Sequence, residues 1–156
     1  MTEIVNLFDH QEYLQEVAEL TWKEWSSKHG AKLEDIIYRT AHSISHDIPT
    51  VLIAIEDQKL LGFGAVWRND LTARQDLYPW LATLYVKEEV RSRGLGKMIQ
   101  DAIIDYVKAR GNDHLYLVTN HDHYYERNGW VFLGMAPKGN GSDTRLYGYE
   151  INKGNK

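Results

Sequence analysis

The spacing of apolar and polar residues predicts alternating strands and helices along this chain. A short apolar stretch over residues 4–7 predicts a strand. Asp9 then precedes Glu12 by three residues, as in a capping box, and apolar residues recur at helical spacing up to His29 and Gly30. A second helical pattern covers residues 33–45.

The rest of the chain continues with apolar strands, one long amphipathic helix and a final hairpin. The expected elements are strands 50–56 and 60–67, a polar loop 69–79, a strand 80–86, a helix 94–110, a strand 115–119, a short helix 122–128, and a hairpin of strands 130–135 and 145–151. The order β-αα-βββ-α-β-α-ββ indicates a mixed α/β (α+β) fold. At this length we expect a single domain over residues 1–156.

Composition narrows the class of protein. Hydrophobic residues make up 43% of the chain and charged residues 26%, as in ordinary globular domains. The chain has no cysteine, which excludes disulfides, thiolate metal sites and a cysteine nucleophile. No signal peptide is visible and no apolar run approaches the ~20 residues of a membrane helix, so we expect a cytoplasmic protein with no membrane partner. The net charge of −4 disfavours nucleic acid as a partner.

A basic, glycine-bearing loop precedes the long helix. Gly94 and Gly96 allow backbone N–H groups to converge at the helix start, where the helix dipole favours an anion. Arg91, Arg93 and Lys97 add positive charge around this position. The loop therefore predicts a site for a pyrophosphate group.

Two common nucleotide motifs do not fit this loop. A Walker A loop requires Ser or Thr after its Gly-Lys pair and a first glycine further upstream, and here Met98 and Arg91 occupy these positions. A dinucleotide fingerprint requires a third glycine where Ile99 stands.

Two motifs instead resemble the GNAT superfamily of N-acyltransferases. The run Arg91-Ser92-Arg93-Gly94-Leu95-Gly96 matches the acyl-CoA loop pattern Arg/Gln-x-x-Gly-x-Gly/Ala. The run Tyr124-Tyr125-Glu126-Arg127-Asn128-Gly129-Trp130 is similar to the Phe-Tyr-x-x-x-Gly-Phe signature of the same family. The resemblance covers residues 80–135, and it implies the GNAT fold with a central, mostly antiparallel sheet.

The resemblance implies acetyl-CoA as the acyl donor and assigns roles to the matching residues. The pyrophosphate would bind the loop formed by Arg91, Ser92, Arg93, Gly94, Leu95, Gly96 and Lys97. The pantetheine arm would run along the strand residues Leu84, Tyr85 and Val86, where one backbone N–H would polarise the thioester carbonyl. Asn120 would hydrogen-bond the same arm, and Tyr125 would protonate the departing thiolate as general acid.

The general base is left open by the sequence. Many family members carry a glutamate near the start of the strand before the CoA loop, but residues 80–83 contain no carboxylate. Asp76, His121 and His123 are the alternatives. His121 and His123 with the intervening Asp122 also suggest a metal site, but we interpret them as polar residues at a helix start and expect no metal.

Together these observations predict transfer of an acetyl group from acetyl-CoA to a primary amine of a small molecule, by direct attack and without a covalent enzyme intermediate. The alternatives are a protein N-terminus or lysine as the acceptor, and a non-catalytic acyl-CoA sensor. The edge of the last hairpin predicts a homodimer contact, by analogy with the family.

Overall fold

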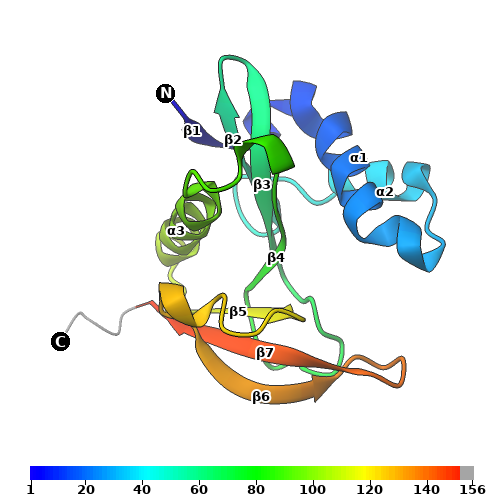
Figure 1. Ribbon diagram of the computed structural model, residues 1–156, viewed down its shortest axis with the longest axis vertical. Coiled ribbons are helices and arrows are strands. Elements are labelled where there is room, and N and C mark those ends of the chain that lie inside the picture. Colours follow the sequence, from blue (N-terminus) through cyan, green and yellow to red (C-terminus); the bar gives the residue numbers. More distant parts are fainter. Residues whose placement is uncertain (152–156) are drawn as a thin grey trace.

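The computed structural model describes residues 1–151, so the last five residues of the expected domain lie outside the described residues. Seven strands form one sheet in the order β1-β2-β3-β4-β5-β7-β6 (Figure 1). The strands are β1 (Glu3–Asn6), β2 (Thr50–Glu56), β3 (Lys59–Trp67), β4 (Trp80–Val86), β5 (His114–Thr119), β6 (Val131–Pro137) and β7 (Asp143–Glu150). The α-helices are α1 (Leu14–Glu24), α2 (Leu33–Ala41) and α3 (Leu95–Lys108). The expected mixed fold with a mostly antiparallel sheet is confirmed.

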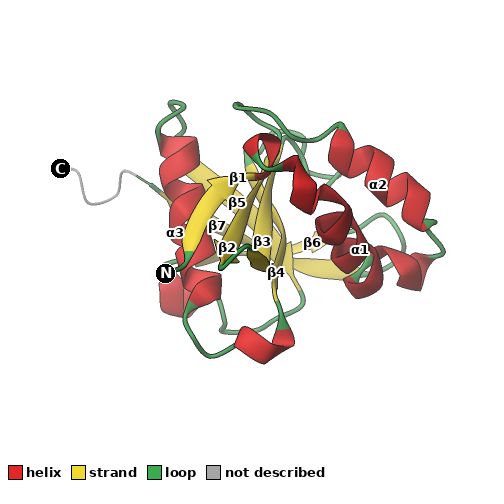
Figure 2. Ribbon diagram, turned by 90° about the horizontal axis from the view of Figure 1, so that it is seen from above, coloured by secondary structure: helices red, strands yellow, loops and turns green. Residues whose placement is uncertain are grey.

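Helices cover both faces of the sheet, with α3 on one side and α1 and α2 on the other (Figure 2). Leu52 belongs to the buried cluster that contains Ile99 of α3, whereas the neighbouring Ile53 belongs to the cluster that contains Val17 of α1. Because successive strand residues point to opposite faces, a strand covered on both faces is apolar throughout. This explains the uninterrupted apolar run of β2, in which each large side chain contributes about 1.5–3 kcal/mol by burial.

A glycine in β3 allows the long helix to approach the sheet closely. A Cβ at Gly64 would lie 2.8 Å from Cδ1 of Ile103 and 3.0 Å from Cγ2 of Ile99, and both isoleucines are fully buried. The Gly62-Phe63-Gly64 run in β3 thus brings α3 against the strands that lead into the basic loop.

The strand before the basic loop carries a bulge. Phe63 pairs with Tyr85 and Ala65 pairs with Ala82, so Thr83 and Leu84 together face the single residue between Phe63 and Ala65. Thr83 adopts a φ of 46°, in the left-handed region that a β-branched residue rarely occupies. The bulge interrupts the pairing of β3 with β4 at Thr83 and Leu84, and the pairing resumes at Tyr85 and Val86.

The sheet opens between β4 and β5. These two strands are parallel, and within residues 1–151 they pair at Trp80 and Tyr116 alone. In Figure 1, β4 runs vertically while β5 crosses below it with β7 and β6. Beyond Trp80, the β5-facing edge of β4 therefore has no strand partner, and its backbone polar groups remain available to a ligand.

One predicted helix is replaced by a much shorter element. Residues 122–128 form only a 3-10 turn at Glu126–Asn128, which ends at Gly129 with a φ of 92°. His123 has a φ of 66°, and this left-handed residue prevents a continuous α-helix through the predicted segment. The helix predicted up to residue 45 also ends earlier, at Ala41.

Candidate active site

Two hollows meet where β4 and β5 diverge. The first, which we call the loop groove, has a volume of about 730 Å³ and is lined by Glu24, Trp25, Leu84, Tyr85, Val86, Arg91, Ser92, Gly94, Leu95, Gly96, Lys97, His121, Tyr124, Tyr125, Arg127 and Asn128. The second, which we call the inner cavity, has a volume of about 440 Å³. Four residues line both hollows: Trp25, Leu84, His121 and Tyr125. A ligand in the groove can therefore touch a ligand in the cavity at these residues.

The start of α3 forms the floor of the loop groove. Gly94 stands just before the helix with a φ of 77°, and no side chain caps the first-turn N–H groups of α3. Gly96 lies under Tyr124, since a Cβ at Gly96 would be 3.0 Å from the Tyr124 hydroxyl oxygen. Free N–H groups at the start of this fourteen-residue helix, beside two glycines, are an arrangement that favours an anion such as a phosphate group.

The three basic residues of the loop have different positions. Arg91 lines the groove, with its Nε donating a hydrogen bond to the Val86 carbonyl oxygen at 2.9 Å. Lys97 also lines the groove and pairs with Asp101 at 2.8 Å. Arg93 turns away and pairs with Glu56 at 3.1 Å, so it is not among the residues lining the groove.

Tyr125 lies at the junction of the groove and the cavity. Its side chain is only 8% exposed and packs edge-on against Tyr124, with ring centroids 4.8 Å apart, and against Trp130 at 6.0 Å. Burial, with a smaller contribution from Tyr124, raises the pKa of Tyr125 well above its ordinary value. The hydroxyl therefore stays protonated at neutral pH and can act as a proton donor.

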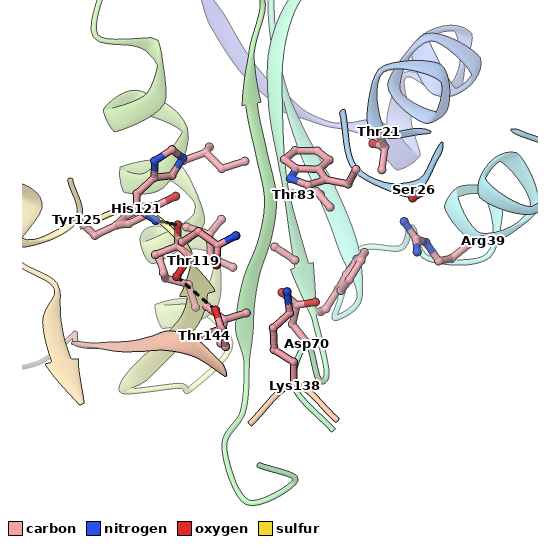
Figure 3. A pocket seen from close by; sticks show the side chains of 18 residues that line it. Thr21, Ser26, Arg39, Asp70, Thr83, Thr119, His121, Tyr125, Lys138 and Thr144 are labelled. Atoms are coloured by element: carbon pink, nitrogen blue, oxygen red, sulfur yellow. Dashed lines mark hydrogen bonds between the residues drawn. The ribbon is translucent and has the colours of Figure 1, made fainter. Parts of the chain in front are cut away.

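The inner cavity is built from elements that are far apart in the sequence (Figure 3). Its lining residues are Thr21, Trp25, Ser26, Arg39, Trp67, Asp70, Leu81, Ala82, Thr83, Leu84, Leu117, Val118, Thr119, Asn120, His121, Tyr125, Lys138 and Thr144. Hydroxyl groups and two tryptophans form most of the polar and aromatic wall. The volume lies within the range of about 300–1,000 Å³ that is typical of small-molecule sites.

Asp70 is the acidic residue of the inner cavity, and the sequence reasoning missed it. Burial raises the pKa of Asp70 to about 7, although the positive charge of Arg39 partly opposes this shift. Asp76, the carboxylate that the sequence singled out, instead pairs with Arg74 at 2.8 Å on the exposed loop and lines neither hollow. No sequence signal separates these two aspartates, because both lie in the same polar loop.

The remaining candidates divide between the two hollows and the surface. Asn120 lines the inner cavity rather than the groove, where the expected pantetheine contact would lie. His121 lines both hollows, but the side chain of His123 is 84% exposed and lines neither.

A cluster of possible metal ligands lies on the surface. Its ligand atoms, which lie within 4.8 Å of one another, belong to Asp122, His123 and Glu126. Arg145 pairs with Asp122 at 3.1 Å, so a side chain of the protein already supplies a positive charge to this cluster.

The comparison with known families decides the identity of this fold. The family model described as "Acetyltransferase (GNAT) family" matches residues 14–130, which is more than half of the chain. The chain belongs to the GNAT acetyltransferase family. It is thus a member of a class of acetyl-CoA-dependent N-acetyltransferases.

Individual relatives of this GNAT protein have low sequence identity and nearly complete coverage. N-alpha-acetyltransferase 30 of Schizosaccharomyces pombe is 25% identical over 151 residues, which cover 93% of this chain and 88% of the relative. An aminoglycoside 6'-N-acetyltransferase in complex with coenzyme A matches with a TM-score of 0.74 at 16% identity, over 96% of this chain and 97% of that one. A GNAT acetyltransferase from Staphylococcus aureus Mu50 matches with a TM-score of 0.67 at 20% identity, over 97% and 99%. These structural matches show a shared fold.

Among the residues that the structure describes, every helix is too short or too polar to cross a bilayer.

Proposed function

We propose that this GNAT protein transfers an acetyl group from acetyl-CoA, bound in the loop groove, to a primary amine of a small molecule in the inner cavity. The observation that carries the proposal is the meeting of the two hollows at Leu84, His121 and Tyr125. Direct transfer requires the amine nitrogen and the thioester carbon to come together, and such positioning contributes up to about 7–11 kcal/mol. The inner cavity has the size of a small-molecule site.

The proposed position of acetyl-CoA follows from the free hydrogen-bonding groups. The pyrophosphate lies on the first turn of α3, with Arg91 and Lys97 beside it. The pantetheine arm lies along Leu84, Tyr85 and Val86, where β4 has lost its β5 partner. The acyl end of the arm then reaches the junction next to Tyr125. Arg93 and Asn120 have no part in this arrangement, because neither lines the groove.

The proposed reaction needs three groups at the junction. The amine nitrogen attacks the thioester carbon, and the negative charge on the carbonyl oxygen is stabilised by a backbone N–H beside the β4 bulge. The carbon–sulfur bond breaks, and the buried Tyr125 hydroxyl gives its proton to the departing thiolate, an effect worth about 10²–10⁴-fold in rate. His121, which lines both hollows, takes one proton from the substrate ammonium group before the attack, directly or through water. The second proton, which the nitrogen loses as the amide forms, restores the Tyr125 hydroxyl.

Replacement of the proposed acid tests this mechanism. Tyr125→Phe should lower kcat by about 10²-fold or more while the Kd for acetyl-CoA changes little, because the ring still packs in the same place. Tyr116→Phe is the matched control, since Tyr116 packs against Trp80 and lines neither hollow. Calorimetric titration with acetyl-CoA and a thiol-release assay measure the two quantities. Unchanged kcat in Tyr125→Phe would contradict the assigned role, and absence of acetyl-CoA binding to the native protein would contradict the function itself.

A protein N-terminus is the second candidate acceptor, because the Schizosaccharomyces pombe relative is an N-alpha-acetyltransferase. A peptide acceptor requires the inner cavity to open to a groove that accommodates several residues. Incubation with an N-terminal peptide library and acetyl-CoA, read by mass spectrometry, separates the two classes of acceptor. Acetylated peptides with kcat/KM above that of every small amine would favour this second candidate.

A homodimer through β6 remains part of the proposal. β6 is an edge strand of the sheet, and it exposes the large apolar side chains of Val131, Phe132, Leu133 and Met135. Exposed apolar edges of this kind mark association surfaces. Light scattering of the purified protein measures the oligomeric state.

The cytoplasmic location likewise stays a prediction.

A further inference from the structure

The inner cavity carries more positive than negative charge. Arg39 enters from α2, Asp70 from the loop after β3, and Lys138 from the loop between β6 and β7 (Figure 3). Two cations therefore face one carboxylate. The Arg39 guanidinium lies over the Trp67 ring at 5.0 Å, and it acts on Asp70 through charge alone, without a hydrogen bond. Its fork of donors remains available to a ligand.

These charged groups lie away from the reacting junction. In Figure 3, Tyr125 and His121 lie on one side of β4, whereas Arg39 and Asp70 lie on the other side. An acceptor whose amine reaches Tyr125 therefore presents its opposite end to Arg39 and Lys138. Arginine binds carboxylates with two parallel hydrogen bonds, and such charge-assisted bonds are about twice as strong as neutral ones.

We infer that the acceptor is an amine with a carboxylate at its far end, which Arg39 binds with the help of Lys138. This inference rests on the proposed function and names the substrate class of the inner cavity. A polycationic amine would place a second positive charge beside Arg39 and Lys138, which is unfavourable. Asp70 opposes a carboxylate only weakly, because burial raises its pKa to about 7 and the group is partly protonated at neutral pH.

The test compares amines that differ only at the far end. The probes are glycine, 4-aminobutanoate and 6-aminohexanoate, their carboxamides, and kanamycin as a polycation, each with acetyl-CoA in a thiol-release assay. For the longer carboxylates we expect kcat/KM to exceed that of the matching amide by about tenfold, the size of one charge-assisted hydrogen bond. Glycine should show no such preference, because its carboxylate cannot reach across the cavity.

Variants connect the preference to the named residues. Arg39→Gln should erase the preference for the carboxylate over the amide, Lys138→Gln should reduce it, and Arg39→Lys should retain part of it. None of these changes should alter the Kd for acetyl-CoA, because neither residue lines the loop groove. Lys108→Gln is the matched control at an exposed lysine outside both hollows. Melting temperatures verify that each variant is folded.

The outcomes distinguish failure of the inference from failure of the proposed function. If acetyl-CoA binds and amides or kanamycin are the better substrates, the inference is overturned and the acetyltransferase function stands. A carboxylate preference that survives in both Arg39→Gln and Lys138→Gln also overturns it, as does acetyl-CoA binding with no acetylation of any carboxylate probe. Failure of the native protein to bind acetyl-CoA contradicts the proposed function itself.

Discussion

Replacement of Asp70 by asparagine should stabilise the protein, and increasingly so as the pH rises. Burial raises the pKa of this carboxyl from 3.8 to about 7. Between these two values the folded state keeps a proton that the unfolded state has lost, so the ionisation of Asp70 lowers the free energy of unfolding as the pH increases. The asparagine side chain of the variant has no such ionisation, and the difference between the two proteins therefore grows from about pH 4 to pH 7 and is constant above it.

The size of the effect follows from the same two values. Each unit of pKa difference corresponds to about 1.4 kcal/mol. The difference between 3.8 and about 7 therefore limits the increase in the free energy of unfolding from Asp70→Asn to about 4 kcal/mol. Asp70 is only partly buried and faces an open cavity, and solvent screening there reduces the expected gain above pH 7 to about 1–2 kcal/mol.

Denaturant unfolding at pH 4.5, 6 and 8.5 measures this difference for the native protein and Asp70→Asn. Asp76→Asn is the matched control, because Asp76 is exposed and the Arg74 side chain lowers its pKa by a hydrogen bond. The stability from Asp76 is present above its unfolded-state pKa, so its loss should be slightly destabilising at all three pH values, without the increase with pH expected for Asp70→Asn. If the difference in free energy of unfolding between Asp70→Asn and the native protein does not change with pH, the reasoning is refuted.

Three further predictions concern packing, the loop groove and the exposed edge. Gly64→Val should lower the free energy of unfolding by about 1–3 kcal/mol in denaturant titrations, because its Cβ would meet buried Ile103 at 2.8 Å. Arg91→Gln should weaken calorimetric acetyl-CoA binding by about tenfold, whereas Arg93→Gln should change it little because Arg93 pairs with Glu56 outside the groove. Phe132→Glu should shift a dimer to a monomer in light scattering; a protein already monomeric would contradict the proposed β6 contact.

Sequence periodicity was sufficient to predict the order of the strands and of the three α-helices, and to place the glycine-bearing basic loop at the start of the long helix. Both depend on local rules: apolar spacing separates strands from helices, and glycines before an amphipathic helix leave its first N–H groups free. The loop from Arg91 to Lys97 accordingly lies at the start of α3, as predicted. The helix predicted over residues 122–128 was wrong, because the left-handed conformation of His123 interrupts it and the sequence pattern does not report backbone dihedral angles.

The composition of the inner cavity was decided only by the tertiary structure. Arg39, Asp70 and Lys138 come from three segments with no common motif, and they face one space because β4 and β5 diverge after a single pair of residues. The direction of the Arg93 side chain also depended on a partner distant in sequence, since it pairs with Glu56. Local patterns predict elements because their causes lie within a few residues, whereas a cavity is the space left between elements and depends on how the whole chain packs.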